Sequence, residues 1–468
     1  MTDIYEFMES IILETLLDWN FWGTFRRTLI PREEYEARLG LFMEGQEVVV
    51  VKGIRRAGKS SLIYSHLSRL FSDGKVSPED TLIINFEDPR LPTDLDAEGL
   101  TGIYEVYMRH KSPKGRVVAV LDEVQYVKGW ERFARWLSEA KGAKVIVTGS
   151  SSKLMSEEYA TALTGRHLDL NVSPLSFKEF LRFKGVSVSD GVDLLRERFK
   201  VQNLLIEYLT YGGFPEVALS GSVERKVELL RNYFWDILVK DAAKRFSVEK
   251  LAKFERLARN YISNISSIQS FNKLKRELGI SLDTVERWSG YLATTGLFTF
   301  MEKFSFSVTE QLRGMKKVYA ADTGFYTSSG FRFMDNVWRV MENAVAANLL
   351  VGTALRPDLE VYYYRTEGAE VDFVVKRGAR VERLVQVTYA SRRDEVGRRE
   401  LRSLTKAAEE TRCGRLEVVT WNYEGAERCG ERVVEFIPLW KWLLGYGEAA
   451  SFRGNMPPKV QDRADDDA

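Results

Sequence analysis

The glycine-rich stretch from Gly53 to Ser60 constrains the fold of this chain more than any other feature. It reads Gly-Ile-Arg-Arg-Ala-Gly-Lys-Ser, matches the pattern G-x-x-x-x-G-K-[ST] at every fixed position, and follows the apolar run 48–51. A buried strand that turns through glycines into a helix leaves several backbone N–H groups around one small bowl, which suits a phosphate. The sequence therefore predicts a nucleotide site, and a chance glycine turn is the disfavoured alternative.

Each fixed position of this loop has an expected role. Gly53 and Gly58 let the backbone bend and come close to an anion. Lys59 is expected to reach the β- and γ-phosphates, and the Ser60 hydroxyl is the expected Mg²⁺ ligand. The predicted cofactors are therefore ATP or ADP with Mg²⁺. The predicted nucleotide-binding residues of the loop are Gly53, Ile54, Arg55, Arg56, Ala57, Gly58, Lys59, Ser60 and Ser61.

Length and composition limit the remaining classes of protein. The chain has 468 residues, which suggests about three domains. Its 68 Lys and Arg against 67 Asp and Glu give a net charge of +1, so no global positive field draws it to nucleic acid or lipid. Two cysteines and three histidines are too few for a disulfide framework or a zinc site. We expect a cytoplasmic protein without a membrane partner, because a signal peptide and an apolar run of roughly 18 residues are also lacking.

An acidic pair follows the second informative strand. The apolar run 117–121 leads directly into Asp122 and Glu123. A carboxylate at the carboxyl end of a buried strand beside a phosphate loop can hold Mg²⁺, and that role is assigned to Asp122. Glu123 is expected to polarise the attacking water. The alternative is that these two acids merely end a strand and have no role in catalysis. The nearby phosphate loop, which requires an acidic partner, makes this alternative less favoured.

Two further catalytic candidates follow along the chain. The strand that begins at Lys144 ends in small polar residues, and Thr148 or Ser150 is placed to hydrogen-bond the γ-phosphate or the attacking water. Simple capping of the strand end is an equal alternative. Arg166 lies in a loop after this strand and is a candidate arginine finger, with a surface charge as the alternative.

These motifs resemble those of archaeal and bacterial AAA+ ATPases related to the STAND class. The resemblance extends over nearly the whole chain and implies an α/β fold, a P-loop core on a parallel sheet, and ATP hydrolysis. It further implies that Gly213 and Pro215 contact the nucleotide. AAA+ kinship suggests a ring and STAND kinship a monomer held closed by ADP, so the subunit count stays open. The resemblance also uses the segments 85–88, 174–177 and 212–215 and Trp130.

The predicted order of helices and strands changes after the ATPase core. Residues 271–288 read as a helix, a turn at Gly279 and a second helix capped by Ser281, and two alternating strands follow, which favours a winged helix. The second helix has a mixed-charge face, so DNA binding and protein binding remain equally open. The residues of that face are Asp283, Thr284, Glu286 and Arg287, and the candidate phosphate contacts are Lys273, Lys275 and Arg276.

The last third of the chain resembles the PD-(D/E)xK restriction-endonuclease-like core. In active members a helix glutamate, a strand aspartate and an E-x-K triplet gather Mg²⁺ and activate water. Glu342 and Asp372 match, but the triplet position reads Gln386-Val387-Thr388 and lacks both the acid and the lysine. We expect a degenerate fold that does not cut DNA, unless a group such as Glu370 or Lys376 replaces what is missing.

The sequence thus predicts Mg²⁺-dependent ATP hydrolysis that drives or switches a winged-helix and nuclease-like module. A slow nucleotide-dependent switch or scaffold that binds a protein partner is one alternative, and an ATP-gated metal-dependent nuclease is another. The expected partners are ATP and either DNA or a protein. The predicted regions are 1–180 (P-loop core with N-terminal helices), 181–245 (helical lid), 246–330 (winged helix), 331–447 (restriction-endonuclease-like domain) and 448–468 (disordered tail).

Overall fold

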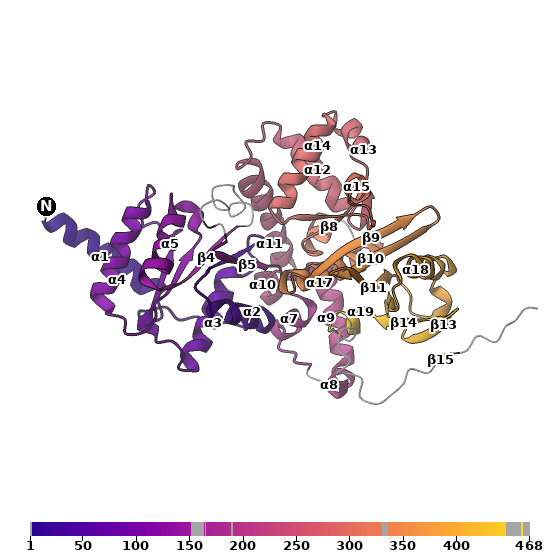
Figure 1. Cartoon of the computed structure of the whole chain (residues 1–468), viewed down its shortest axis with the longest axis horizontal. Helices are drawn as coiled ribbons and strands as arrows, with labels where there is room; N and C mark the ends of the chain where they lie inside the picture. Colours follow the sequence, from indigo (N-terminus) through magenta and orange to yellow (C-terminus); the bar gives the residue numbers. More distant parts are fainter. Residues whose placement is uncertain are drawn as a thin grey trace, which may run out of the picture. The chain divides into compact units, whose positions relative to one another are not determined.

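The chain forms two compact units in a computed structural model, Met1–Val172 and Ser173–Ala468 (Figure 1). The structure describes residues 2–150, 163, 165–188, 191–329, 336–445 and 460–461. Apart from residues 460–461, the tail expected at 448–468 lies outside the described residues.

The first unit is built on a five-stranded parallel sheet with strand order β2-β3-β4-β1-β5. This sheet confirms the predicted α/β class. Strands β1 to β4 are almost entirely buried, as expected for apolar runs of a parallel sheet that helices cover on both faces. The strands are β1 (Val48–Gly53), β2 (Thr81–Asn85), β3 (Val118–Asp122), β4 (Lys144–Ser150) and β5 (His167–Val172).

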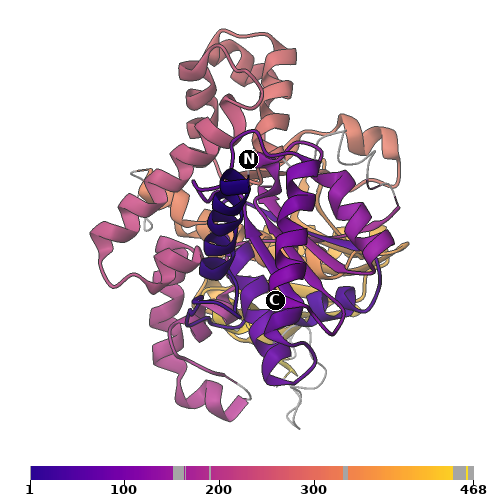
Figure 2. The ribbon, with the colours of Figure 1, turned by 90° about the vertical axis from the view of Figure 1, so that its left-hand side faces the viewer.

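Helices surround this sheet (Figure 2). One apolar cluster packs α1, α4 and α5 against the strands through residues such as Leu16, Tyr104 and Phe133. Helices α2 and α3 contact each other, and α3 also contacts β1. The helices are α1 (Thr2–Trp19), α2 (Glu33–Met43), α3 (Lys59–Ser72), α4 (Ala97–Lys111) and α5 (Trp130–Lys141), with short 3₁₀ turns η1 (Pro78–Asp80) and η2 (Val124–Tyr126).

The strand register brings the predicted motifs to one edge of this sheet. Gly53, the last residue of β1, lies opposite Ser150 at the end of β4, and Asp122 ends β3 opposite Asn85 of β2. The carboxyl ends of parallel strands meet at the same edge, where ligands of open α/β sheets bind. The loop after β1 and the acidic pair after β3 therefore share this edge.

The second unit opens with a helical region. Its α9 and α11 contact α16, and a π-helical segment η3 extends α11. The elements are α7 (Phe177–Phe183), α8 (Gly191–Arg196), α9 (Arg198–Tyr211), α10 (Pro215–Leu219), α11 (Val223–Asp236) and η3 (Ile237–Ala243).

Four helices and a small antiparallel sheet follow. The sheet has the order β6-β8-β7, and α13 and α14 are joined by a turn at Gly279, whose φ of 59° suits glycine. The Ser281 hydroxyl accepts a hydrogen bond from the backbone N–H of Thr284 and so caps α14. The elements are α12 (Leu251–Ser263), β6 (Ser267–Gln269), α13 (Phe271–Leu278), α14 (Leu282–Thr294), β7 (Phe298–Met301), α15 (Val308–Arg313) and β8 (Lys316–Ala320).

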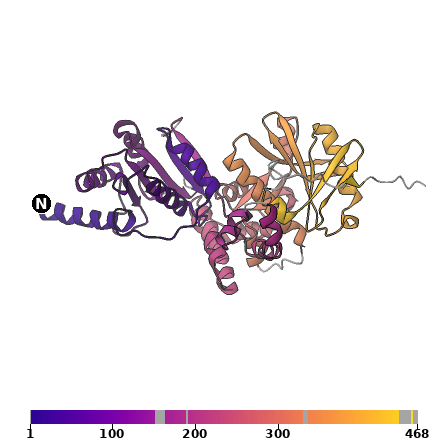
Figure 3. The same cartoon turned by 90° about the horizontal axis from the view of Figure 1, so that it is seen from below.

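A seven-stranded mixed sheet completes the second unit (Figure 3). Its order is β15-β13-β14-β12-β11-β10-β9; β9, β10 and β11 pair antiparallel, whereas β11, β12 and β14 run parallel. Helix α18 packs on this sheet through an apolar cluster that includes Leu404 and Val418. The elements are α16 (Gly324–Ser328), α17 (Val337–Leu355), β9 (Leu359–Thr366), β10 (Ala369–Arg377), β11 (Arg380–Val387), η5 (Arg393–Glu395), α18 (Arg398–Thr411), β12 (Leu416–Thr420), β13 (Gly425–Cys429), β14 (Arg432–Pro438), α19 (Leu439–Trp442) and β15 (Val460–Gln461).

No helix within the described part of the chain is long and apolar enough to cross a membrane.

The buried His66 on α3 makes the stability of the first unit depend on pH. Burial, together with the positive charges of Arg69 and Lys75, lowers the pKa of His66 to about 4. The unfolded chain, with an ordinary histidine pKa near 6.5, binds a proton that the folded state excludes as pH falls from 6.5 toward 4. We therefore expect the free energy of unfolding to fall by about 2 kcal/mol between pH 7 and 4.5 through this group alone.

Urea titrations of the full chain at both pH values would measure this loss. The variant His66→Gln should show a smaller loss than the wild type between the two pH values. An unchanged difference in His66→Gln would contradict the assignment.

Candidate nucleotide-binding site

The glycine-rich loop joins the end of β1 to the start of α3. Gly53 has a φ of 155°, and a β-carbon there would lie 2.0 Å from the carbonyl oxygen of Val172, so this close approach to β5 requires glycine. Gly58, with a φ of 91°, is the N-cap of α3 and has no side chain to bond the first N–H groups of the helix. Arg56 also has a positive φ of 68°. The loop therefore combines a strained backbone with an N-terminus suited to an anion.

The Lys59 ammonium is buried beside this loop. The residue is only 5% exposed, and its Nζ donates to the carbonyl oxygens of Gly53 at 3.3 Å and Ile54 at 3.4 Å. These two hydrogen bonds hold the loop backbone close to the Lys59 ammonium. Such an arrangement places a cation among backbone N–H groups, which is the chemistry that a phosphate requires.

Asp122 is the centre of a hydrogen-bond network at the same edge. Its Oδ1 accepts from Ser60 Oγ at 2.9 Å and from the Thr148 hydroxyl, and its Oδ2 accepts from the Tyr64 hydroxyl at 3.0 Å. Burial raises the pKa of Asp122, and the hydrogen bonds from Thr148 and Ser60 oppose that rise. The structure thus brings together the two predicted Mg²⁺ ligands, and both offer the hard oxygen atoms that Mg²⁺ prefers.

Glu123 follows directly in a left-handed backbone conformation with a φ of 60°. Its backbone N–H donates to Thr148 Oγ1 at 3.0 Å, so one hydroxyl fixes both acidic residues. Its side-chain Oε2 accepts from Gln125 Nε2, while Gln125 Oε1 is buried with no hydrogen-bond partner. Sequence reasoning did not assign a role to Gln125, although it lies two residues after the acidic pair.

The other predicted polar residue of β4 lies in the same region. Ser150 is buried opposite Gly53. The hydroxyls predicted to sense a γ-phosphate therefore lie at the carboxyl edge of the sheet. The neighbouring residues Ser151 and Ser152 lie outside the described residues.

Arg166 lies away from the phosphate loop of its own chain, and its predicted role as an arginine finger stays a prediction. Its carbonyl accepts from the N–H of Val48, the first residue of β1, so Arg166 lies at the amino edge of the sheet. Its half-exposed guanidinium pairs with Glu139 of α5 at 3.1 Å. The phosphate loop lies at the opposite edge, beyond the length of β1. Arg166 therefore does not reach the loop that precedes it in the chain.

Gly213 and Pro215 belong to the second unit. The Gly213 N–H donates to the buried Asp322 carboxylate at 2.7 Å, and a β-carbon at Gly213 would lie 2.3 Å from the Leu175 carbonyl oxygen. Pro215 is the first residue of α10, where its lack of an N–H costs nothing. Burial raises the pKa of Asp322 to about 7. These contacts explain the glycine and proline structurally, and their predicted contact with a nucleotide stays a prediction.

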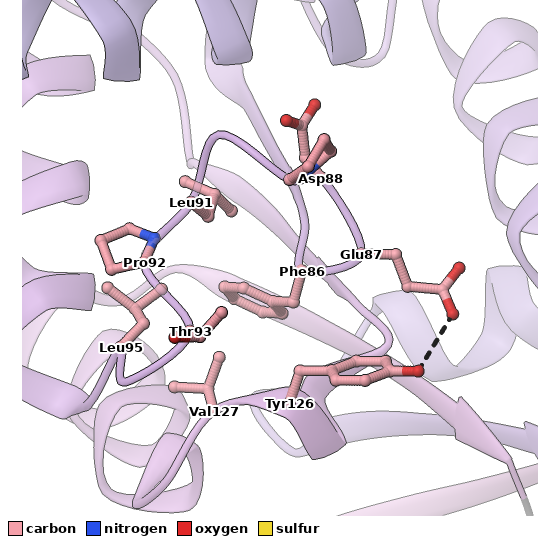
Figure 4. A pocket seen from close by; sticks show the side chains of 10 residues that line it. Phe86, Glu87, Asp88, Leu91, Pro92, Thr93, Leu95, Tyr126 and Val127 are labelled. Atoms are coloured by element: carbon pink, nitrogen blue, oxygen red, sulfur yellow. Dashed lines mark hydrogen bonds between the residues drawn. The ribbon is translucent and has the colours of Figure 1, made fainter.

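A pocket of about 560 Å³ opens beside the acidic pair, between the loops that follow β2 and β3 (Figure 4). Apolar side chains such as Phe86, Leu95 and Val127 form much of its wall. The Tyr126 hydroxyl donates to Glu87 at 3.3 Å, and Arg90 holds Asp88 in an ion pair. Sequence reasoning missed this pocket because its lining comes from two loops without regular spacing.

The acidic residues singled out in the last third of the chain form a second cluster, and a lysine lies at its centre. Lys317 Nζ of β8 lies 2.8 Å from Glu342 Oε1 and 2.8 Å from Asp372 Oδ1. Gln386 Nε2 donates to Asp372 Oδ2 at 2.7 Å. The sequence pointed to Lys376 as a replacement lysine, but Lys376 pairs with Glu360 instead. Among the described residues, no group of three or more His, Cys, Asp or Glu side chains is arranged to hold a metal ion.

Family models match three segments of the chain. One model, described as an AAA domain, matches residues 45–181, which include the phosphate loop and the acidic pair. Two models described as domains of unknown function, DUF8612 and DUF4143, match residues 202–332 and 339–442. The first unit therefore contains a P-loop ATPase domain.

Two solved structures are similar at low identity. The Walker-type ATPase PABY2304 of Pyrococcus abyssi is 15% identical and aligns over 65% of this chain and 99% of its own, with a TM-score of 0.43. Cdc6p from Pyrobaculum aerophilum is 12% identical over 71% of this chain and 97% of its own, with a TM-score of 0.29.

Relatives of similar length occur in an archaeon and a bacterium. An uncharacterized protein of Haemophilus influenzae is 26% identical over 368 residues, which cover 78% of this chain and 88% of the relative. The uncharacterized protein MJ1544 of Methanocaldococcus jannaschii is 30% identical over 412 residues, which cover 86% of this chain and 89% of the relative. The chain therefore belongs to the same family as MJ1544.

Proposed function

We propose that this protein is a Mg²⁺-dependent ATPase whose nucleotide state switches the conformation of its second unit. The observation that supports this proposal best is the network in which Ser60, Thr148 and Tyr64 all donate to the buried Asp122 carboxylate. The network lies at the edge of the sheet where β1 passes into the phosphate loop. Neutral hydroxyl donors do not compensate the charge of a buried carboxylate, so a cation beside Asp122 would be stabilised.

The residues of the site fit Mg²⁺ and the phosphates of ATP. Ser60 and Asp122 would hold the metal, and a bound Mg²⁺ would neutralise charge on the β- and γ-phosphates. Lys59 binds the phosphates from within the loop, and the N–H groups at the start of α3 add hydrogen bonds and the positive end of the helix dipole.

Glu123 is the residue that we assign to the attacking water. Its carboxylate can accept a proton from water or orient it, and Thr148 holds its backbone in place. Gln125 donates to the same carboxylate, so this hydrogen bond has to exchange for one from water before hydrolysis. This requirement is compatible with slow hydrolysis, as a molecular switch needs.

A protein partner is favoured over DNA for the second unit. We assign α12 to β8 as a winged helix, since the helices α12, α13 and α14 and an antiparallel three-stranded sheet follow in the order of that fold, with the short α15 between β7 and β8. Two of its basic side chains are already paired, Lys273 with Glu277 at 3.6 Å and Arg287 with Asp283 at 3.7 Å. The segment between β7 and β8 exposes four large apolar side chains, Phe306, Val308, Leu312 and Met315. Such a surface suits a protein better than a phosphate backbone.

The variant Lys59→Ala should lose ATP turnover. The substitution removes the cation from the phosphate loop, and one such charged contact is worth roughly a hundredfold or more in kcat/KM. A steady-state phosphate-release assay with Mg²⁺ would measure the loss. Lys75→Ala, at an exposed lysine paired with Asp73, serves as the matched control and should hydrolyse ATP at the wild-type rate. Wild-type kinetics in Lys59→Ala would refute the site.

The variant Glu123→Gln should bind ATP but cleave it at least a hundredfold more slowly. The amide keeps the shape of the side chain and loses the charge that polarises water, an effect that general-base catalysis places at 10²–10⁴-fold. Titration with a fluorescent ATP analogue would report binding, and single-turnover kinetics would report cleavage. Glu105→Gln, at an exposed glutamate of α4, is the control. Cleavage at the wild-type rate in Glu123→Gln would transfer the role to another residue.

The purified protein should not cut DNA with Mg²⁺ or Mn²⁺, even when ATP is present. Lys317 already pairs with Glu342 and Asp372, and Gln386 supplies an amide where an acid would bind metal. A supercoiled plasmid incubated with the protein would reveal nicking on a gel. Metal-dependent nicking that Asp372→Ala abolishes and Lys59→Ala preserves would show that the second unit is a nuclease.

A further inference from the structure

A second pocket, of about 520 Å³, opens in the second unit next to Lys317. We call it the acidic pocket, because four carboxylates line it and only two basic side chains do. The acids are Glu342, Glu370, Asp372 and Glu400, and the basic residues are Lys317 and Arg365. With every group in its ordinary ionised form, four negative and two positive charges leave a net charge of −2. A pocket of this charge attracts cations and repels phosphate.

The pocket already holds one ammonium group of its own. Lys317 is buried, and its Nζ lies within 2.8 Å of both Glu342 and Asp372 and 3.4 Å from Glu370. The Tyr319 hydroxyl also donates to Glu342, at 2.6 Å. Burial and the neighbouring Asp372 nevertheless raise the pKa of Glu342 to about 8. Lys317 thus supplies one positive charge to three carboxylates, those of Glu342, Glu370 and Asp372.

Two buried acceptors on the pocket wall have no donor. Gln386 is 9% exposed; its Nε2 donates to Asp372, but its Oε1 has no hydrogen-bond partner. Glu400 Oε2 is also buried without a partner, and burial raises the pKa of this carboxyl. Buried acceptors are normally satisfied, so these two atoms point to a ligand that presents at least two N–H donors.

Two aromatic side chains line the same pocket and are well exposed. Trp338 is 44% exposed and Tyr389 is 48% exposed. Large aromatic rings beside carboxylates and free acceptors suit a flat cation, which can stack on a ring while its N–H groups bond to oxygen atoms. An ammonium group lacks the flat face, and a metal ion would need the place between Glu342 and Asp372 that Lys317 occupies.

We propose that the acidic pocket binds the guanidinium group of an arginine side chain presented by a polypeptide. The guanidinium donates to Gln386 Oε1 and Glu400 Oε2 and lies against the exposed rings. This binding site goes beyond the proposed ATPase activity and does not depend on it. It gives the second unit a specific means to recognise a basic protein segment.

Isothermal titration calorimetry of the full chain with Nα-acetyl-arginine amide would test the proposal. We expect saturable binding of one ligand per chain at pH 7 without nucleotide. Glu400→Gln should weaken it about tenfold, because a hydrogen bond to a charged group is lost. Glu370→Gln removes one negative charge from the pocket and should also weaken binding. Because the Glu370 side chain is 41% exposed, this substitution should leave the folded structure intact. Glu360→Gln, on the same sheet but outside the pocket, should bind as the wild type does.

Three further ligands separate the alternatives. Nα-acetyl-lysine amide should bind at least tenfold more weakly, because it offers no flat face. Free arginine should not bind more tightly than the capped amide, because its α-ammonium and α-carboxylate add no net charge and it lacks the flanking amide groups of a polypeptide. Mg²⁺ should not compete. The absence of saturable binding, wild-type binding by Glu400→Gln and Glu370→Gln, equal binding of the lysine compound, tighter binding of free arginine, or competition by Mg²⁺ would each overturn the proposal.

Discussion

The buried carboxylate of Asp122 is the constraint on which the candidate ATPase site depends. A charged group inside a sheet edge is costly unless donors surround it, and here Ser60 from α3, Tyr64 from the same helix and Thr148 from β4 supply them. Because Thr148 also accepts the N–H of Glu123, the same network orients the residue assigned to water activation. The end of the phosphate loop, the proposed metal ligands and the proposed base are thus parts of one hydrogen-bonded assembly.

Much of this site could be predicted because its parts are encoded by local spacing. The phosphate loop needs only a strand, two glycines, a lysine and a hydroxyl in consecutive positions, and Asp122 needs only the end of an apolar run. The double role of Thr148 could not be predicted, because it depends on the register of β4 beside β3, which brings residues 26 positions apart within hydrogen-bond distance. The contact of Gln125 with Glu123 could not be predicted either, because it depends on the left-handed backbone conformation of Glu123.

Arg166 and Lys317 show two different limits of reading a sequence. Arg166 immediately precedes a strand that pairs in parallel with β1, so it had to lie at the amino edge of the sheet, away from the phosphate loop. That outcome followed from strand direction alone and could have been deduced. Lys317 could not be found in this way, because it lies on a strand of a different small sheet, 55 residues before Asp372. Only the packing of β8 against α17 and β10 brings its ammonium to the carboxylates.

The two buried carboxylate sites differ in the charge of their donors, and this difference decides what each can bind. Around Asp122 the hydrogen-bond donors are the neutral hydroxyls of Ser60, Tyr64 and Thr148, which do not compensate a negative charge, and this favours the divalent cation that we propose beside a nucleotide. Around Glu342 and Asp372 the donors include the Lys317 ammonium, whose positive charge pairs with both acids. A lysine in that place removes the electrostatic reason for Mg²⁺ to bind, while the acceptors of Gln386 and Glu400 remain for an organic cation. In our proposals, similar acids therefore serve a metal-dependent site in one unit and a metal-free recognition pocket in the other.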